Sequence, residues 1–328
     1  MKIITKGEKM NNLKKVGLTA LAGSLAAFSA NAAELSVSGA TVLTYTSEDA
    51  SEVTGNPFGM KTNVGFAASG EVNGYDVSYF ITSADQFGGM SSARLSVDLG
   101  DMGTLAFDQG SGSGLATIDD KTPTAAEEIW DGLDAKSHGG LVGTAGSSGV
   151  FNYINTFAGV NFNAALRKGG AGSQADGASS GAGEGAWDFA ATTSLGDSLA
   201  VGAGWGEETG ADGNDHSTIF ANYTLGMATV GYQYSHIADN AAAGVDEVAD
   251  AMGLAVNLNE NLSVSIGKRN VEYKKSSTLS VTEEGTGVAV AYTMGSVKIA
   301  GNRNEVKHNQ GVSGAADSMT EVAVSFAF

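Results

Sequence analysis

Alternation of apolar residues with small or polar ones runs through most of the chain and restricts its fold more than any other feature. Leu35, Val37, Leu43 and Tyr45 alternate with serines and threonines, and the same period of two returns in segments of about ten residues. Because successive side chains of a strand point to opposite faces, each segment predicts a β-strand with one apolar face. A helical period is nearly absent, and the exception is a short helix expected at 124–135.

Sixteen such segments can be placed along the sequence. They are expected at 34–46, 60–72, 75–84, 91–99, 103–109, 149–157, 160–168, 186–195, 198–206, 217–225, 227–236, 249–258, 261–275, 285–294, 296–307 and 318–328. Tight turns such as Asn73-Gly74 and Gly196-Asp197 alternate with longer stretches rich in Gly, Ser and Asp. Short turns on one side and long loops on the other are typical of a transmembrane antiparallel β-barrel, so we expect an all-β fold of this class.

The last eight residues, EVAVSFAF, carry the alternation to the final position. An even number of antiparallel strands brings the first and last strands together, and pairing between them removes the sheet edge. We therefore expect Val322, Val324, Phe326 and Phe328 to face lipid along a seam that closes on Leu35–Tyr45. The alternative is a secreted β-sandwich or β-helix, but a sandwich buries its apolar face with large residues and does not need this alternation in every strand.

The N-terminal residues 1–32 have the pattern of a secretory signal peptide. Lys14 and Lys15 precede an apolar run at 16–28, and Ala30-Asn31-Ala32 supplies a small-x-small cleavage motif. The run is too short to span a bilayer as a helix, and the alternative is an anchor that stays uncleaved. We expect cleavage after Ala32 and a single β-barrel domain at 33–328.

Charge and cysteine content narrow the function classes. Residues 1–32 hold five lysines and one glutamate, so their removal changes the formal charge of the chain from −18 to −22. A charge of this sign repels nucleic acid. The chain has no cysteine, so disulfides cannot hold an exported fold together.

Four stretches of the sequence carry a resemblance to a known family. They are LSVDLGDMGTLAFDQG (95–110), VFNYINTFAGVNFNAAL (150–166), IFANYTLGMATVGYQYS (219–235) and the terminal Phe328. With the strand pattern around them, they resemble the general porins of Gram-negative outer membranes, especially the sixteen-stranded family common in alphaproteobacteria. The resemblance implies an outer-membrane location, a homotrimer, and recognition of Phe328 by the outer-membrane assembly machinery.

The resemblance also implies that the third extracellular loop folds into the barrel and narrows it. The long stretch at about 110–148 follows the fifth expected strand, and in this family an acidic loop faces a cluster of basic wall residues. The acidic side of the constriction is then Asp119, Asp120, Glu127, Glu128, Asp131 and Asp134. On the lumen parity of the strands, the basic wall is Lys61, Arg94, Arg167 and Arg269. The chain departs from the family at Asp108-Gln109, where the strand often ends in Gly-Arg.

A barrel of sixteen strands is too wide for side chains to fill, so its interior holds water and tolerates charge. Ions in such a pore experience the charges at its narrowest point. We therefore expect a general diffusion porin that passes small hydrophilic solutes and ions, with a mild preference for cations. Two alternatives stay open: a barrel whose loops act as an adhesin or receptor, and a substrate-specific channel, for which Phe80 and Phe220 are the few lumen aromatics.

Other side chains suggest weaker possibilities. The four histidines lie in loops or at strand ends without a triad or zinc spacing, so we expect no enzymatic activity and no required cofactor. Asp119 with Asp120, and Asp212 with Asp215, are possible ligands for calcium, although their spacing does not match an EF-hand. Lys268, in the basic stretch GKRNVEYKK, is expected to point outward toward lipopolysaccharide phosphates or a neighbouring subunit.

Overall fold

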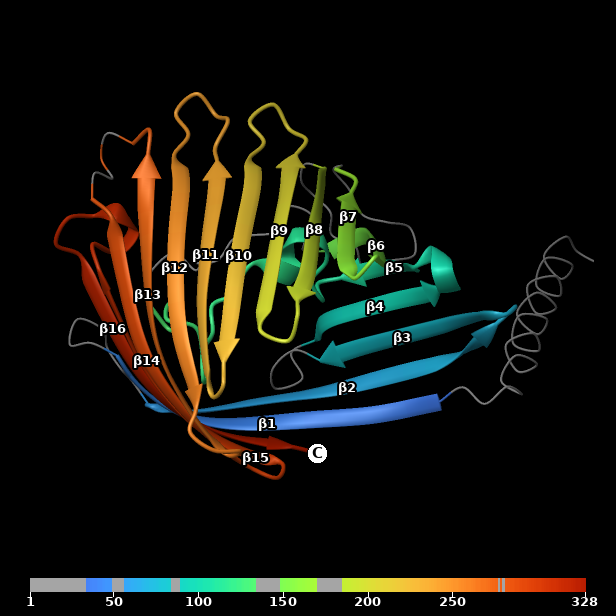
Figure 1. The fold of residues 1–328 in the computed structure, drawn as a ribbon, viewed down its shortest axis with the longest axis horizontal. Coiled ribbons are helices and arrows are strands. Elements are labelled where there is room, and N and C mark those ends of the chain that lie inside the picture. The colour runs from blue at the N-terminus through green and yellow to red at the C-terminus, as the bar shows by residue number, and fades with distance from the viewer. Residues whose placement is uncertain are drawn as a thin grey trace, which may run out of the picture.

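Sixteen antiparallel strands form one closed barrel in the computed structural model of the chain (Figure 1). The structure describes residues 34–48, 56–83, 89–133, 148–169, 185–276, 278 and 281–328. The strands are β1 (Glu34–Glu48), β2 (Phe58–Val72), β3 (Tyr75–Ser83), β4 (Met90–Asp98), β5 (Thr104–Gln109), β6 (Ser148–Phe157), β7 (Val160–Arg167), β8 (Ala186–Leu195), β9 (Leu199–Glu208), β10 (Asp215–Leu225), β11 (Ala228–Ala238), β12 (Asp246–Asn257), β13 (Leu262–Lys274), β14 (Glu283–Met294), β15 (Val297–Lys307) and β16 (Ala316–Ala327). The predicted number of strands and their antiparallel closure are confirmed.

The barrel is closed by pairing of the first and last strands. Val324 lies opposite Leu43 and Val322 opposite Tyr45 in the β1–β16 ladder. Beyond that ladder, the backbone N–H of Phe328 donates to the Gly39 carbonyl oxygen at 3.0 Å, and the Gly39 N–H donates back at 2.8 Å. The Phe328 ring covers Gly39, because a Cβ atom there would lie 2.6 Å from a ring carbon. The chain therefore ends inside the sheet, with no free strand edge.

The two faces of the wall differ as the alternation predicts. Large apolar side chains such as Leu35, Ile219, Tyr232 and Phe326 stand exposed on the outside of the barrel. Most positions between them carry small or polar residues that face the lumen, and exceptions such as Phe220 and Met319 pack against the connection between β5 and β6. An outer apolar face exposed along every part of the wall suits lipid rather than water, since monomeric soluble proteins rarely expose so large an apolar surface.

Connections are short at one end of the barrel and longer at the other (Figure 1). The chain passes from β10 to β11 through Gly226 and from β14 to β15 through Gly295, and both glycines have a positive φ that tight turns require. At the other end, β5 and β6 are joined by residues 110–147, the longest connection between strands. Among the described residues, no helix is both long and apolar enough to cross a membrane.

The expected helix at 124–135 is wrong for the part of it that the structure describes. Residues 124–133 form bends and isolated turns, and the only short 3-10 helix in the described part of this connection is η3 (Gly114–Ile118). In a helix at these positions the Glu128 carbonyl oxygen would accept from the N–H of residue 132, but here it accepts from Asn304 Nδ2 of the barrel wall at 3.0 Å. The wall thus takes the place of intrahelical partners.

Candidate functional site: the lumen and its inner loop

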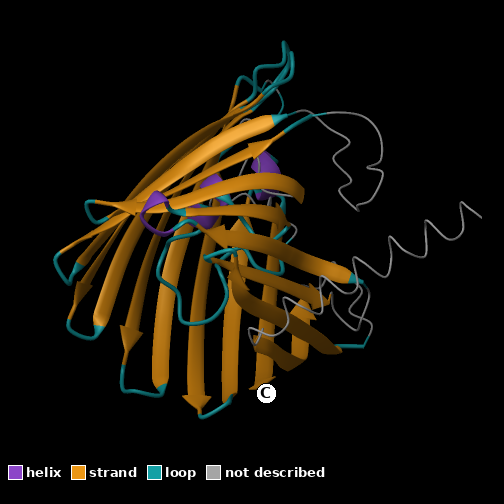
Figure 2. Ribbon diagram, turned by 90° about the vertical axis from the view of Figure 1, so that its right-hand side faces the viewer, coloured by secondary structure: helices purple, strands orange, loops and turns teal. Residues whose placement is uncertain are grey.

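The described part of the long connection, residues 110–133, lies inside the barrel along its wall (Figure 2). We call this segment the inner loop. It touches β7 and β8 near η3 and reaches β16 at its far end, where Gly132 meets Met319. Wall side chains hold its backbone along this path, so the loop is attached at many points. A connection of this length has backbone groups to satisfy, and here polar side chains of the strands satisfy them.

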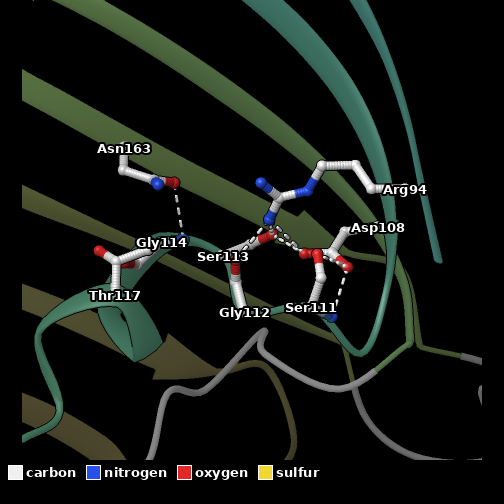
Figure 3. A network of polar contacts seen from close by, with 8 residues as sticks. All are labelled: Arg94, Asp108, Ser111, Gly112, Ser113, Gly114, Thr117 and Asn163. Atoms are coloured by element: carbon white, nitrogen blue, oxygen red, sulfur yellow. Dashed lines mark hydrogen bonds and ion pairs between the residues drawn. The ribbon is translucent and has the colours of Figure 1, made fainter. Parts of the chain in front are cut away.

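The loop leaves β5 through a compact network of polar side chains (Figure 3). A guanidinium nitrogen of Arg94 on β4 donates to Asp108 Oδ2 at 2.7 Å and also to the Gly112 carbonyl oxygen. Asp108 in turn accepts hydrogen bonds from the backbone N–H and the hydroxyl of Ser111, at 2.8 Å and 2.7 Å. The charge of Arg94 is therefore balanced by Asp108, which is one of the two residues at which the chain departs from the family pattern. This ion pair holds the start of the loop in place.

Side chains of β7, β8 and β11 hold the first half of the loop, and those of Asp188 on β8 and Gln233 on β11 are buried. Asn163 Oδ1 accepts from the Gly114 N–H at 2.7 Å, and Asp188 Oδ1 accepts from the Leu115 N–H at 2.8 Å. Gln233, which is 2% exposed, donates to two loop carbonyl oxygens and accepts from the Lys121 N–H at 2.6 Å. Each of these groups is paired in the folded loop, and a lost partner leaves a buried polar group unsatisfied.

The far end of the loop is held on β13 and β15. Asn304 Nδ2 donates to the carbonyl oxygens of Glu128 and Asp131, at 3.0 Å and 2.9 Å. The Arg269 guanidinium lies 5.2 Å from the centroid of the Trp130 ring, a cation–π distance. Arg269 is 1% exposed and forms an ion pair with Glu283, which is fully buried.

Glycines on the lumen face of the wall make room for the loop. A Cβ atom at Gly204 would lie 2.4 Å from Leu115 Cδ1, and one at Gly253 would lie 2.6 Å from the Pro123 carbonyl oxygen. Gly231, Gly267 and Gly287 are equally close to Pro123 or Ile129. The role of these glycines was not predicted from the sequence. They lie at lumen-facing positions of neighbouring strands, and that pattern is the signal that could have indicated a loop packed against the wall.

Five of the six acids predicted for the constriction lie on the inner loop: Asp119, Asp120, Glu127, Glu128 and Asp131. Burial and the neighbouring Asp120 raise the pKa of Asp119 to about 7, and burial with Asp120 and Glu127 nearby raises the pKa of Glu128 to about 7. Burial and Glu127 also raise the pKa of Asp131, against the effect of Lys61. The sixth predicted acid, Asp134, lies outside the described residues.

The predicted basic wall is much weaker than expected. Arg269 lies behind Trp130 and does not face open water, which corrects its predicted place on the wall. Arg94 is paired with Asp108, and Arg167 is the last residue of β7, at the long-loop end. Lys61 on β2 is exposed and lies within electrostatic reach of Asp131 and Glu321. Of the four predicted cations, Lys61 alone is both exposed and opposite the acidic end of the loop.

The possible calcium ligands are separated into two places. The Asp119 carbonyl oxygen accepts a hydrogen bond from Gln233 Nε2. Gln233 pairs with Phe220 in the β10–β11 ladder, and Asp215 is five residues from Phe220 along β10. That spacing is about 17 Å along a strand, so the two pairs cannot share one ion. In the part of the chain that the structure describes, no three Asp, Glu, His or Cys side chains are grouped as a metal site. Calcium binding stays a prediction.

The chain matches one known protein family and is similar to solved barrel structures. The family model for Gram-negative porins matches residues 17–328. No protein with a curated description matches the sequence.

Among solved structures, the chain is similar to an anion-selective porin from Comamonas acidovorans, with 12% identity and a TM-score of 0.65 over 90% of this chain and 100% of that one. It is also similar to the trimer form of OmpT, an outer membrane protein of Vibrio cholerae, with 15% identity and a TM-score of 0.63 over 91% and 100%. A mutant of the Rh. blastica porin matches with 15% identity and a TM-score of 0.62 over 90% and 100%.

Proposed function

Because the chain belongs to the Gram-negative porin family and forms an outer-membrane channel of that class, we propose that it is a general diffusion porin. Small hydrophilic solutes and ions cross its lumen passively down their gradients. No bond is made or broken in this process, so the protein acts through the width and the charge of its pore.

One observation carries this proposal: the inner loop covers one side of the lumen and leaves the other side open. Lumen-facing side chains from β8 to β16, such as Asp188, Gln233 and Asn304, are buried beneath the loop. On β1–β4, no lumen-facing side chain of the described residues is buried. The water-filled path therefore runs between the loop and the β1–β4 wall, past Lys61.

We propose that the path prefers cations mildly. Loop acids stand on one side, whereas Arg94 and Arg269 are each paired with a carboxylate. Lys61 on the β2 wall faces more than one acid, and Lys121 on the loop lies beside Asp119, so the acids of the narrow region outnumber these cations. The charges act over a wide, wet pore, so salt screens them beyond about 10 Å at 0.1 M.

The two rival functions have less support. The outer connections of the second half of the barrel are short, with 209–214, 239–245 and 308–315 as examples, and they offer little surface for an adhesin or receptor. A substrate-specific channel is expected to line its path with aromatics. Phe220 is 6% exposed and packs against Leu115 and Ile118 under the loop, so it does not stand on the β1–β4 side where the path runs.

Liposome swelling with neutral sugars of increasing size tests the proposal. A general porin gives swelling rates that fall smoothly with solute size to a cutoff. A closed receptor barrel gives no swelling with any sugar, and a specific channel admits one sugar far faster than others of the same size. Either of the last two results would overturn the proposal.

Four further features are proposed with the porin function. Residues 1–32 are a signal peptide, so mature protein begins at Ala33 in N-terminal sequencing. The channel is a homotrimer, which cross-linking in detergent tests. Phe328 is part of the signal for the assembly machinery, so its deletion lowers the amount of protein in the outer membrane. Lys268, exposed on the outer face of β13, contacts lipopolysaccharide phosphates, and native mass spectrometry of Lys268→Gln tests that contact.

A further inference from the structure

The lumen contains an alcove between the inner loop and the inner face of β6–β10. Its volume is about 470 Å³, within the range of about 300–1,000 Å³ that holds small-molecule ligands. The lining is rich in neutral hydrogen-bonding groups. They come from Thr117, Asn161, Asn163, Thr192, Ser194 and Asn222.

The alcove lies on the short-turn side of the loop. Asn161 is two residues from the turn at Gly159, and Ser194 is two residues from the turn at Gly196. The loop is held farther from these turns, by Asp188 and Gln233. In a barrel with periplasmic turns, a solute reaches the alcove from the periplasm without crossing the narrow region.

The floor of the alcove is apolar and rigid. Ile118, Ala190 and Phe220 belong to one buried cluster, with exposures of 1%, 2% and 6%. The apolar surface that a solute can reach belongs to Ile154 and Ala200, which are half-buried, and the amides and hydroxyls around it offer hydrogen-bond partners to sugar hydroxyl groups.

The charge of the alcove is opposite to that of the rest of the chain. Its lining includes no aspartate or glutamate, and its one charged side chain is Lys121. The backbone of Lys121 is fixed on both sides: its N–H donates to Gln233 Oε1 at 2.6 Å, and its carbonyl oxygen accepts from Asn222 Nδ2 at 2.7 Å. Asp119 interacts electrostatically with Lys121, and the raised pKa of Asp119, about 7, leaves that carboxyl only partly ionised at neutral pH.

We propose that this alcove is a subsite for small polyhydroxylated carboxylates, of which a uronic acid is the simplest cyclic example. The sugar hydroxyl groups meet the amides and hydroxyls of the wall, and the carboxylate meets the Lys121 ammonium. The proposal rests on the proposed channel function, because it assigns a solute class to a position inside the pore.

Three pyranoses of similar size test the proposal: glucuronate, glucose and glucosamine. Each is added on the periplasmic side of single channels in a planar bilayer, and the fraction of time that the current is blocked is measured. We expect glucuronate to block about threefold more than glucose, the scale of one solvent-exposed ion pair, and glucosamine to block least. Equal block by glucuronate and glucose would overturn the proposal.

Two lysine variants separate the alcove from the general field of the lumen. Lys121→Gln should remove the advantage of glucuronate and leave the block by glucose unchanged. Lys61→Gln removes the same charge from the opposite wall, so it should leave the glucuronate advantage in place. If Lys121→Gln has no effect, or if Lys61→Gln acts equally, the site is not the alcove.

A measurement without ionic current distinguishes failure of the site from failure of the channel. Saturation-transfer NMR on detergent-solubilised protein should detect glucuronate contact that Lys121→Gln weakens. Protein that binds glucuronate in this way but conducts no current would contradict the proposed porin function and support the alcove. Channels that conduct but make no contact with glucuronate would support the porin function and contradict the proposed alcove site.

Discussion

Among single residues, Lys61 is the one that we expect to affect the charge balance of the narrow region most. It stands on the open β2 wall, within electrostatic reach of Asp131 and Glu321. An ion that passes about 8 Å from one charge in water has an interaction energy of about 0.5 kcal/mol with it, which is about a twofold effect on permeability. Loss of that charge favours a cation and disfavours an anion by the same factor, so Lys61→Gln should raise the cation-to-anion permeability ratio about fourfold.

Asp131→Asn is the matched opposite change and should lower the same ratio. Both ratios come from the reversal potential of single channels in a potassium chloride gradient. Changes of the same sign in both variants would show that Lys61 and Asp131 do not act as opposed charges in the path.

Asp188 shows how one buried side chain holds the inner loop. It is 1% exposed, and its Oδ1 accepts the Leu115 N–H at 2.8 Å. Asp188→Ala leaves that buried N–H unpaired, which should weaken the attachment of η3 by about 1–3 kcal/mol. We expect more open-channel current noise and brief partial closures.

Asp197→Ala, in the exposed turn of the same β8–β9 hairpin, is the control. It removes an equal charge without touching the loop and should leave the noise unchanged. Identical noise in the Asp188→Ala channel and the native channel would contradict the assigned role of Asp188.

Among the elements, the inner loop is the one from which we expect a pH response of the channel. Asp119 and Glu128 each have a pKa raised to about 7, whereas a solvent-exposed carboxyl titrates near 4. Both groups are protonated and neutral below that value and ionised above it. The cation preference should therefore rise as pH increases through about 7 and fall on acidification.

Reversal potentials measured one pH unit below and one above neutrality test this response. The double variant Asp119→Asn with Glu128→Gln should remove the change between the two conditions. If the native channel shows the same reversal potential at both, these carboxyls do not titrate near neutrality in the open pore.

The strands could be predicted from sequence far better than the loop. Lipid outside and water inside impose an alternation on every strand, and sixteen strands follow from it with ends a few residues from those in the structure. The path of the loop depends on contacts between distant residues, such as Asn304 with Glu128. Arg269 illustrates the limit: its lumen parity was predicted correctly, but its burial behind Trp130 depends on where the loop lies.

At the scale of the whole molecule, the seam between β1 and β16 completes the barrel. The Phe328 ring lies on Gly39, so Gly39→Ala should displace the ring and lower the temperature at which folded barrel is lost in detergent. Gly301→Ala is a fair control, because a Cβ atom there has no neighbour closer than 3.5 Å. Heat-dependent gel mobility measures the unfolding temperature of each variant. If that temperature falls equally in the two variants, the contact between Gly39 and Phe328 has no special role.

We expect the barrel to hold an open pore whose narrow region is acidic on balance. The most direct measurement is the reversal potential of single purified channels in a planar bilayer under a potassium chloride gradient, at low and at high salt. We expect a steady conductance with a cation preference that weakens at high salt, because the Debye length shortens from about 10 Å at 0.1 M to about 3 Å at 1 M. A clear anion preference, or no conductance at all, would contradict it.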